Sequence, residues 1–510
     1  MPVAGQGLMF ASLTRCCPRT SQPLSSSFAT LTTASRKRAS TTTVRASEIF
    51  HSSLLSTQRL LSASKASKHS ASASAKRNHS SSASSSKTRF WRTPRFSSSA
   101  TVRMSSITAT AAGIGSAGLY AVVSNPAQVG AQPEDAADKK HHLKCGKGFT
   151  NPWDSFTELT TWQISKMMMG RRFSGQAHNP DTSLCTVPTQ TPSFLTSRST
   201  PKLRATWLGH ACYYVEFPSG FRVLFDPVFE DCCSPINLKF LKRYTPPPCE
   251  IEDLPVVDAV VISHNHYDHL SYPTIQRIQK RFPDAHFFAP LGNKKWFLAS
   301  GVQNVTELDW WESRDVTLTK NGEKAEVGTG SADTEGSIRA TIGALPCQHV
   351  SARTPFDKCQ TLWASWSVES GGAKVWFAGD TGYRSVPAVP KGTDDYGPDY
   401  AHLPHCPAFA QIGEHRGPFD LGLIPIGAYE PRFVMSPMHA NPKDSVNIFV
   451  DTKCKKALGM HWGTWVLTEE DVMEPPRKLE EALEWKGVEK GRFGVVGLGE
   501  SKEFESGEKA

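Results

Sequence analysis

The sequence predicts a layered α/β body of about 300 residues in one unit, preceded by a leader that has no core of its own. From Arg204 onward, short apolar segments alternate with helical segments, and several apolar segments end at a histidine or an aspartate. Charge sets the leader apart, because residues 1–104 hold 16 Lys and Arg against a single acid, Glu48. The remaining 406 residues sum to −6, so the basic character of the chain gives no indication of nucleic-acid binding by the body.

Residues 1–104 are rich in Ser, Thr, Ala and Arg, with low-complexity runs such as HSASASAKRNHSSSASSSK. Such a composition cannot bury enough apolar surface to fold, so we expect a disordered leader. Arg and Ser without acids are typical of a mitochondrial transit peptide, and the apolar core of a secretory signal is absent from this leader. The alternative is a plain low-complexity tail. The transit interpretation predicts a mitochondrial, membrane-associated protein, with the inner membrane as one candidate.

The stretch ITATAAGIGSAGLYAVVS, residues 107–124, is uncharged over 18 positions. It is just long enough to span a bilayer but only weakly hydrophobic, so it predicts either a marginal anchor or a small-residue linker. We therefore divide the chain into a targeting leader (1–104), a possible membrane anchor and linker (105–144) and a folded domain (145–510). The 12 cysteines are scattered without a CxxC pair, which does not indicate a disulfide-built secreted protein.

The body begins with strands. RATWLGHACYYVEF and FRVLFDP predict two strands joined by a Pro-Ser-Gly turn, and DAVVIS predicts a buried strand. SYPTIQRIQKRF predicts a helix, because Ile275, Ile278 and Phe282 fall at helical spacing after Pro273. Helices are also expected over NKKWFLASG and NPKDSVNIFVDT. Further strands are expected over AHFFAP, VTELDWW, IRATIGALP, LWASWSVE, AKVWFAGD, DLGLIPI and KALGMHWG.

Several of these strands end in a residue that can bind a metal. VVIS leads to His264, GALPCQ to His349, VWFAG to Asp380 and LGM to His461. Loops at strand ends are where a layered fold gathers its functional groups. A single histidine is usually an ordinary polar residue, as we expect for His286. The residues at the strand ends differ from such a single histidine, because several of them share the same position after an apolar strand.

The segment HNHYDH, residues 264–269, has the spacing of a metal site. His264 and His266 follow a strand end two positions apart, so they can bind one Zn²⁺ through neutral imidazoles. Asp268 and His269 lie around the turn and can reach a second ion. A structural zinc is closed by four ligands, with Cys favoured, whereas the candidates here are seven His and Asp residues. Seven ligands for two ions leave positions open for water, which is typical of a catalytic site.

These motifs resemble those of a known family. HNHYDH, the later His349, FAGDTG and MHWGT resemble the metallo-β-lactamase superfamily. The wider set NPWDS, WLGHA, FDPVF, ELDWWE, LPCQH, GPFDLGLIPIGAYEPR and MHWGTW, over roughly residues 148–500, resembles the N-acyl-phosphatidylethanolamine-hydrolysing phospholipases D, including their fungal mitochondrial members. The resemblance implies an αββα sandwich of two mixed β-sheets, flanked by helices, with two zinc ions at one edge.

The resemblance also implies a role for each residue of the pattern. The first zinc would be bound by His264, His266 and His349, and the second by Asp268, His269 and His461, with Asp380 bridging both. His439 and Asp268 are the expected catalytic residues.

Three further residues have expected roles beside this ligand set. The family places His439 near the reacting phosphodiester, although it can equally be an ordinary residue before a helix. Gln348, beside a ligand, either binds substrate or orients its loop. Asp226 is expected to accept a hydrogen bond from a ligand imidazole.

The implied reaction is hydrolysis of N-acyl-phosphatidylethanolamine to N-acylethanolamine and phosphatidic acid, by a hydroxide that bridges two Zn²⁺ ions. The expected partners are a phospholipid substrate at a membrane surface and, by resemblance, a second copy of the chain in a homodimer. One alternative is another hydrolase of the superfamily, a nuclease or a thioester hydrolase, although an acidic body argues against nucleic acid. The other alternative, a non-enzymatic zinc-stabilised membrane protein, predicts closed coordination.

The chain departs from the family pattern in one segment near the site. Residues 384–405, RSVPAVPKGTDDYGPDYAHLPH, are extra between the motifs GDTGY and CPAFAQIG. The segment follows bridging Asp380 closely, so it can reshape the mouth of the site and its substrate selectivity.

We predict that the leader directs import into mitochondria. A fusion of residues 1–140 to a fluorescent protein is expected to co-localise with a mitochondrial marker, because its Arg/Ser-rich, acid-poor composition is that of a transit peptide. The same fusion with its Arg residues replaced by Gln should stay cytosolic. A diffuse signal from the unaltered fusion would contradict the prediction.

Overall fold

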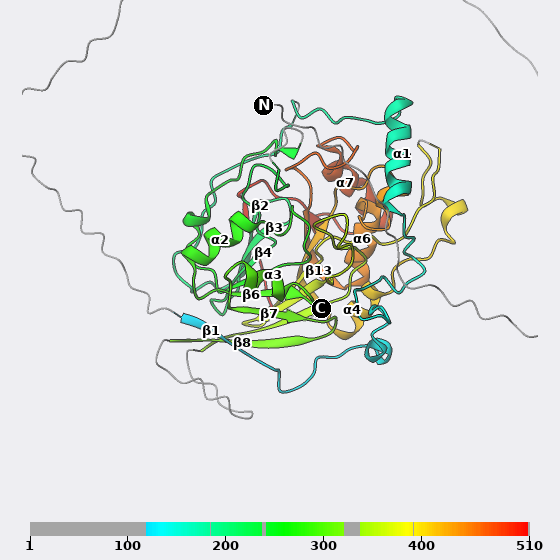
Figure 1. Cartoon of the computed structure of the whole chain (residues 1–510). Coiled ribbons are helices and arrows are strands. Elements are labelled where there is room, and N and C mark those ends of the chain that lie inside the picture. The colour runs from blue at the N-terminus through cyan, green and yellow to red at the C-terminus, as the bar shows by residue number, and fades with distance from the viewer. Residues whose placement is uncertain (1–118, 184, 237–240, 321–336, 391, 508–510) are drawn as a thin grey trace, which may run out of the picture. The chain divides into compact units, whose positions relative to one another are not determined.

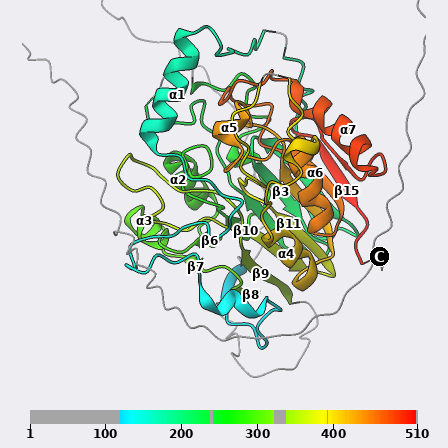
Figure 2. The ribbon, with the colours of Figure 1, turned by 90° about the vertical axis from the view of Figure 1, so that its right-hand side faces the viewer.

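The two β-sheets of the body pack face to face, with helices on their outer faces (Figure 1). The structure is a computed structural model that describes residues 119–507 except 184, 237–240, 321–336 and 391. The leader, residues 1–104, lies outside the described residues. Figure 2, turned by 90°, separates α2 and α3 on one side of the body from α6 and α7 on the other. This arrangement is the predicted αββα sandwich of two mixed β-sheets flanked by helices.

The first sheet has the strand order β1-β8-β9-β10-β11-β12-β13-β14. Neighbouring strands are antiparallel from β1 to β11 and parallel from β11 to β14, so the sheet is mixed. Its strands are β1 (Leu119–Ser124), β8 (Ser313–Lys320), β9 (Ile338–Leu345), β10 (Ser365–Ser370), β11 (Ala373–Phe377), β12 (Phe419–Pro425), β13 (Cys454–Met460) and β14 (Phe493–Gly494).

The second sheet has the order β15-β2-β3-β4-β5-β6-β7 and follows the same plan. Its pairs are antiparallel from β15 to β4 and parallel from β4 to β7. Its strands are β2 (Leu203–Gly209), β3 (Cys212–Glu216), β4 (Arg222–Phe225), β5 (Ala259–Val261), β6 (His286–Pro290), β7 (Val305–Leu308) and β15 (Ser501–Phe504).

Helices cover the outer faces of both sheets. The expected helix after HNHYDH is α2, which begins after Ser271, whose hydroxyl accepts a hydrogen bond from the backbone N–H of Thr274. Ile275 and Ile278 of α2 are fully buried, as their spacing predicts. The helices are α1 (Thr161–Phe173), α2 (Tyr272–Arg281), α3 (Lys294–Ala299), α4 (Ala408–His415), α5 (Arg432–Met435), α6 (Pro442–Asp451) and α7 (Glu474–Lys486), with short 3-10 turns at Glu134–Asp138, Ile251–Asp253 and Pro398–Tyr400.

The core forms on both faces of the second sheet. Along β4, Val223 and Phe225 join the core between the two sheets, whereas Leu224 points the opposite way and packs in the cluster that contains Ile275 of α2. Because side chains alternate along a strand, one strand supplies both layers. A strand buried on both faces is a continuous apolar run, which explains the segments AVVIS and FRVLF.

The structure corrects one expected strand. The run RATWLGHACYYVEF is not continuous but divides into β2 and β3, which pair as an antiparallel hairpin. The turn falls at Gly209, with φ 108°, and His210, with φ 51°, both in the left-handed region. The apolar pattern continues through this turn because both strands and the turn itself are buried. Periodicity alone therefore could not locate it.

The described body begins before residue 145, which was its expected boundary. Residues 119–124 form β1, paired with β8, and therefore do not form the end of a helix over 107–124; residues 107–118 lie outside the described residues. Further along, His141 and His142 reach Asp309 at 2.7 and 2.8 Å. These contacts place the end of the expected 105–144 linker in the body. In the described part of the chain, no helix combines the length and hydrophobicity that crossing a membrane requires.

The extra segment 384–405 is held down by a network of buried charges. The guanidinium of Arg432, at the start of α5, lies 2.8 Å from a carboxylate oxygen of Asp395 and 2.9 Å from one of Asp444. Arg384 stacks on the ring of Tyr396 at 3.7 Å, and the Tyr396 hydroxyl donates to Asp444. The segment is therefore packed onto α5 and α6.

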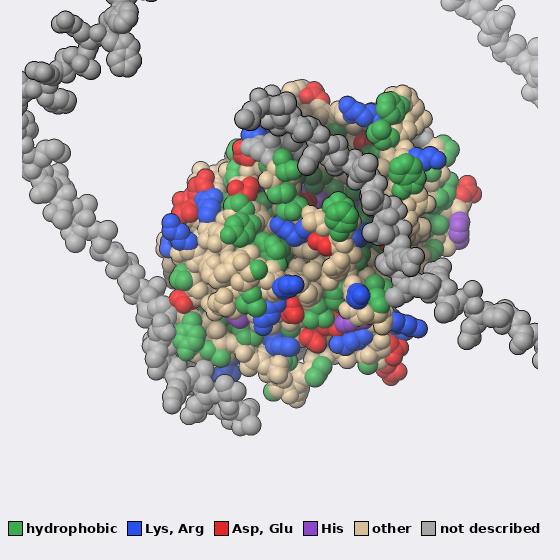
Figure 3. Space-filling view, in the orientation of Figure 1, with side chains coloured by type: hydrophobic (Ala, Val, Ile, Leu, Met, Phe, Trp, Pro, Cys, Tyr) green, Lys and Arg blue, Asp and Glu red, His purple; other side chains and the backbone are tan. Residues whose placement is uncertain are grey.

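The surface of the body carries both charge signs. On the face in Figure 3, Lys and Arg side chains lie interspersed with Asp and Glu. Helix α1 differs, because Trp162 and Phe173 are 76% and 82% exposed and Met169 is 54% exposed. Large apolar side chains gathered on one helix indicate a contact surface.

We predict that Arg432→Met lowers the free energy of unfolding by about 3–5 kcal/mol, because it leaves two buried carboxylates without their shared cation. The measurement is urea unfolding followed by tryptophan fluorescence. The control is Lys443→Met, whose partner Asp394 is 56% exposed, and it should change the free energy by about 1 kcal/mol or less. Equal effects of the two substitutions would contradict the buried network.

Candidate metal centre

The predicted ligand residues meet at one edge of the sandwich, where strands of both sheets end. β5 leads into His264 and His266, β9 into His349, β11 into Asp380 and β13 into His461. Each of these side chains except His266 is at most 2% exposed. Strand ends from two sheets thus supply one cluster, so residues that are far apart in the sequence lie close together in the fold.

The first group of donor atoms is made by three histidines. The Nε2 of His264 lies 2.8 Å from the Nδ1 of His266, and that Nδ1 lies 3.3 Å from the Nε2 of His349. Three ring nitrogens turned toward a common point form a suitable donor set for a divalent ion.

The second group combines two histidines and two carboxylates. An oxygen of Asp380, Oδ2, lies 3.1 Å from the Nε2 atoms of both His269 and His461. Oδ2 of Asp268 lies 3.5 and 3.7 Å from the same two nitrogens. A tetrahedral Zn²⁺ with bonds of about 2.0–2.1 Å separates its ligand atoms by about 3.3–3.4 Å. The observed spacing fits that requirement.

Asp380 lies between the two groups. Its Oδ2 is 3.8 Å from His264 Nε2 and 3.9 Å from His349 Nε2, in addition to its contacts in the second group. Oδ1 of Asp380 and the Nε2 atoms of His269 and His461 are buried without a hydrogen-bond partner. Buried polar atoms without partners are rare in native proteins, so these atoms are accounted for by a bound cation. The residues therefore fit the metal that the fold family implies.

Outer hydrogen bonds fix the rings of the ligand histidines. Nδ1 of His269 donates to Asp226 at 2.7 Å, which confirms the acceptor role expected for that aspartate. Ser263 also donates to Asp226 and lies 2.8 Å from Nδ1 of His264. Nδ1 of His349 donates to the carbonyl of Met438 at 2.9 Å. Such partners set the tautomer and orientation of a metal-binding imidazole.

The protonation states suit a cation. Burial lowers the pKa of His264 and of His349 well below the ordinary value, so both imidazoles are neutral. Burial alone would raise the pKa of Asp380, but the neighbouring His269 and His461 lower it well below its usual range. The carboxylate is thus ionised. Burial would lower the pKa of His269 and of His461, but Asp380 raises both, to about 9 in His461, so without a metal these two rings carry the positive charge that a bound cation would replace.

His439 lies beside the cluster, in the loop between α5 and α6. Its ring is 5.2 Å, centroid to centroid, from the rings of both His349 and His461. Burial lowers the pKa of His439 to about 4, so the ring is neutral at pH 7. Its Nδ1 is buried without a hydrogen-bond partner. This neutral ring is therefore placed to meet a molecule bound at the cluster.

The structure does not support the expected contact of Gln348 with substrate. The side chain is fully buried, and its amide nitrogen donates to the carbonyl of Pro437 at 2.9 Å. Its amide oxygen accepts from the hydroxyl of Ser155 at 2.6 Å. Both polar ends are thus used within the protein. Gln348 therefore connects its own loop to Pro437, two residues before His439, and these contacts fit the expected role in loop orientation better than substrate binding.

Sequence reasoning missed two residues of this region. His210, in the turn between β2 and β3, lies 3.0 Å from Asp268 and groups with Asp268, His269 and His461. His210 follows the end of a strand in the motif WLGHA, as the predicted ligands do, but the continuous apolar run around it made this strand end hard to recognise. Asn151, in NPWDS, donates to the backbone carbonyl of His349 at 2.7 Å. Its partner is distant in sequence, so no local pattern could reveal the contact.

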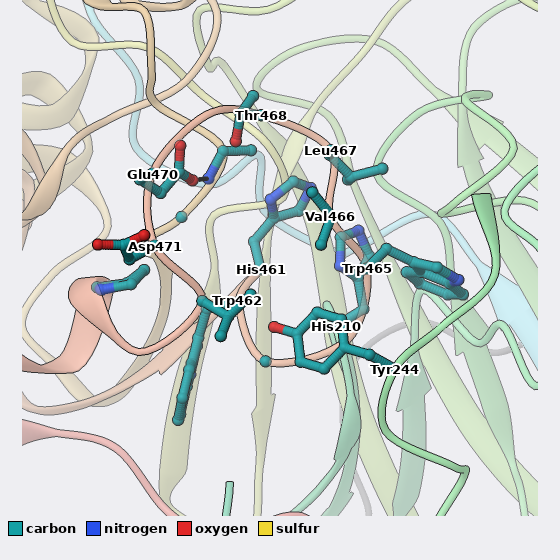
Figure 4. A pocket seen from close by; sticks show the side chains of 15 residues that line it. His210, Tyr244, His461, Trp462, Trp465, Val466, Leu467, Thr468, Glu470 and Asp471 are labelled. Carbon is teal, nitrogen blue, oxygen red and sulfur yellow. Dashed lines mark hydrogen bonds between the residues drawn. The ribbon is translucent and has the colours of Figure 1, made fainter. Parts of the chain in front are cut away.

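A small cavity of about 30 Å³ lies behind the second group. Figure 4 shows the rings of His210 and His461 close together in its wall, with Tyr244 and Trp465 beside them. The rings of His210 and His461 are 4.0 Å apart between centroids. A cavity of this volume cannot by itself enclose a lipid.

Residues 221–462 match the model of the Beta-lactamase superfamily domain. Among curated proteins, the chain is 37% identical over 305 residues to N-acyl-phosphatidylethanolamine-hydrolyzing phospholipase D 1 of Caenorhabditis elegans, covering 58% of this chain and 75% of that protein. It is 33% identical over 302 residues to the mitochondrial N-acyl-phosphatidylethanolamine-hydrolyzing phospholipase D of Saccharomyces cerevisiae, covering 59% and 56%. An uncharacterised protein of Mycobacterium bovis is 32% identical over 314 residues, covering 60% and 71%.

Solved structures are similar at lower identity. A metallo hydrolase of Ignicoccus hospitalis shares 18% of its residues with this chain, with a TM-score of 0.37 over 60% of this chain and 99% of its own. An isothiocyanate hydrolase from Delia radicum gut bacteria shares 15%, with a TM-score of 0.40 over 59% and 99%.

We predict that the purified chain binds about two divalent ions and that Asp380→Asn loses at least one of them. The amide keeps the shape of the carboxylate but lacks its charge and one ligand oxygen. Metal content is measured by mass spectrometry of the native protein. The matched control is His286→Gln, whose ring lies outside the cluster and bonds Thr306 at 2.8 Å, and it should keep both ions. Two ions retained by Asp380→Asn would contradict a bridging carboxylate.

Proposed function

We propose that this chain, which belongs to the N-acyl-phosphatidylethanolamine-hydrolysing phospholipase D family of the metallo-β-lactamase superfamily, hydrolyses N-acyl-phosphatidylethanolamine to N-acylethanolamine and phosphatidic acid. The chain is a hydrolase of the phosphodiester type, as its family membership shows. The acylated phospholipid as substrate and two Zn²⁺ ions as cofactors are the proposed parts. The substrate named for the relatives from C. elegans and S. cerevisiae supports the first of these.

The observation that carries the proposal is the position of Asp380. One of its oxygens lies 3.1–3.9 Å from the Nε2 atoms of four histidines drawn from both donor groups. A carboxylate shared in this way suits two ions a few ångströms apart, which is the arrangement found in enzymes that hydrolyse phosphodiesters. A single structural ion would leave half of these donors unused.

The bound ions would supply an activated water and neutralise charge on the phosphoryl group. The residues of the chain do the rest. His264, His266 and His349 would hold one ion, and Asp268, His269 and His461 the other. Asp226 and Ser263 keep the rings turned toward the ions, because each ring bonded to them has only its remaining nitrogen free.

His439 and Asp268 are the proposed catalytic residues beside the ions. The Asp268 carboxylate is ionised, because His269 and His210 outweigh the effect of burial and lower its pKa well below the ordinary value. His439 is neutral and its Nδ1 has no hydrogen-bond partner among the described residues, so its ring can hydrogen-bond a phosphoryl or leaving-group oxygen. The same loop is fixed to the Asp380 turn by a bond from Ala440 N to Thr381 O at 2.7 Å.

The proposed place of action is a phospholipid surface in mitochondria. Exposed Trp162 and Phe173 on α1, with the exposed basic side chain of Arg172 in its last turn, suit an anionic lipid surface. The word mitochondrial in the name of the yeast relative supports the compartment. The homodimer expected from the family stays a prediction. On the face that Figure 3 shows, side chains of both charge signs are interspersed, so that face does not have the basic character that nucleic-acid binding needs.

We predict that the full chain releases N-acylethanolamine and phosphatidic acid from N-acyl-phosphatidylethanolamine vesicles, and far less product from phosphatidylcholine, a thioester or single-stranded DNA. Products are identified by mass spectrometry. Asp380→Asn should react at least about 100-fold more slowly, because each ion contributes several kcal/mol to the transition state. His286→Gln should keep most activity. Faster turnover of the thioester or DNA than of the lipid would overturn the proposed substrate.

A further inference from the structure

His210 is the residue of this region that the proposed function does not use. It is 3% exposed and occupies the turn between β2 and β3, in the motif WLGHA. Its backbone is fixed on both sides. The N–H of His210 donates to the hydroxyl of Thr464 at 2.7 Å, and its carbonyl accepts from the indole of Trp207 at 2.9 Å and from the N–H of His461 at 3.0 Å.

The backbone of His210 adopts a conformation that is uncommon for residues other than glycine. Its φ of 51° lies in the left-handed region, where asparagine, aspartate and histidine are the non-glycine residues found most often. Glycine would occupy the position without steric strain. A bulky ring at such a turn is explained when the ring itself has a task. The contacts of the ring show which atom it serves.

The ring of His210 is aimed at a metal ligand. Its Nε2 lies 3.0 Å from Oδ2 of Asp268. That same oxygen faces the Nε2 atoms of His269 and His461 at 3.5 and 3.7 Å, so it is the oxygen of Asp268 turned toward the second donor group. The ring of His210 is itself packed edge-to-face against Trp465, with the centroids 4.8 Å apart, and cannot easily turn away (Figure 4).

His210 differs from the ligands in one respect. The Nε2 atoms of His269 and His461 each lie 3.1 Å from Asp380, whereas His210 has its ion-pair contact with Asp268. His210 groups with Asp268, His269 and His461 as a possible ligand, but unlike those two histidines it makes no ion-pair contact with Asp380 among the described residues. Its N–H is a hydrogen-bond donor to the ligand.

We propose that His210 is a positioning residue of the second metal: it donates from Nε2 to Oδ2 of Asp268 and holds that oxygen toward His269 and His461. The inference rests on the proposed two-metal function and adds a residue to it. It also links two motifs, because the N–H of His210 is held by Thr464 of MHWGTW while its ring holds Asp268 of HNHYDH.

The effect should be confined to one ion. In the first donor group, Ser263 holds the ring of His264 and the Met438 carbonyl holds the ring of His349. Among the described residues, His210 has no hydrogen bond to Ser263 or to Met438. Loss of an outer hydrogen-bond partner typically weakens metal affinity by about 10–100-fold. Removal of the His210 ring should therefore weaken the second ion by about this factor and leave the first unchanged.

The test compares His210→Gln, His210→Asn and His210→Ala in the full chain, titrated with Zn²⁺ alone against a chromophoric chelator. A glutamine amide reaches about as far as Nε2, whereas an asparagine amide falls short of it. If His210 acts as the donor, Gln keeps the second ion, while Asn and Ala weaken it by about 10–100-fold. If the residue only maintains the turn, Asn is tolerated best, because it favours the left-handed conformation.

Two controls separate the outcomes. Ser263→Ala should weaken the first ion, which His210→Ala leaves unchanged, because Ser263 contacts His264 as well as Asp226. His286→Gln should weaken neither ion. Wild-type affinity for both ions in His210→Ala, or better retention by Asn than by Gln, would overturn the role of His210. Because no lipid enters this titration, a wild type that binds two ions but leaves N-acyl-phosphatidylethanolamine intact would refute the proposed substrate alone. A wild type that binds one ion would overturn both.

Discussion

A buried carboxylate needs a cation, and the site is organised around that need. Asp380 is 1% exposed, and one of its oxygens lies among four imidazole nitrogens while the other has no hydrogen-bond partner. An isolated buried charge would be shifted to its neutral form or would destabilise the fold. A bound divalent metal would resolve the conflict, because it would compensate the charge of the carboxylate between the rings. The strand ends and loops at this edge of the sandwich place the metal-ligand atoms of the other side chains close to the Asp380 carboxylate.

The hydrogen bonds behind the ligands extend that organisation into the core. Asp226 accepts from His269 and from Ser263, so one buried aspartate connects both donor groups. Behind the opposite side, Gln348 holds the loop of His439 and is itself held by Ser155. The metal centre is thus rigid because each of these side chains has a second task in packing or loop structure. Rigid ligands preserve the open positions that a hydrolase needs for water.

Local sequence patterns predicted most of the elements but only part of the site. Buried runs such as FRVLF and the helical spacing of Ile275 and Ile278 depend on near neighbours, so they are visible in the sequence. The positions of His264, His349, Asp380 and His461 at strand ends were visible for the same reason. His210 was not, because its turn is as apolar as the strands beside it. The task of Gln348 depends on Ser155 and Pro437, at separations of 193 and 89 residues, and no local pattern encodes it.

The pairing of β15 with β2 affects the order in which the chain folds. Ser501 and Thr206 lie side by side in the second sheet although they are 295 positions apart. During synthesis, β2 emerges long before its edge partner, and its backbone groups on that side stay unpaired until β15 follows. Contacts of such separation close slowly, and unpaired edges invite aggregation. Until β15 has been synthesised, one edge of β2 therefore stays open to pairing with other strands, and the turn that carries His210 lies directly after this strand.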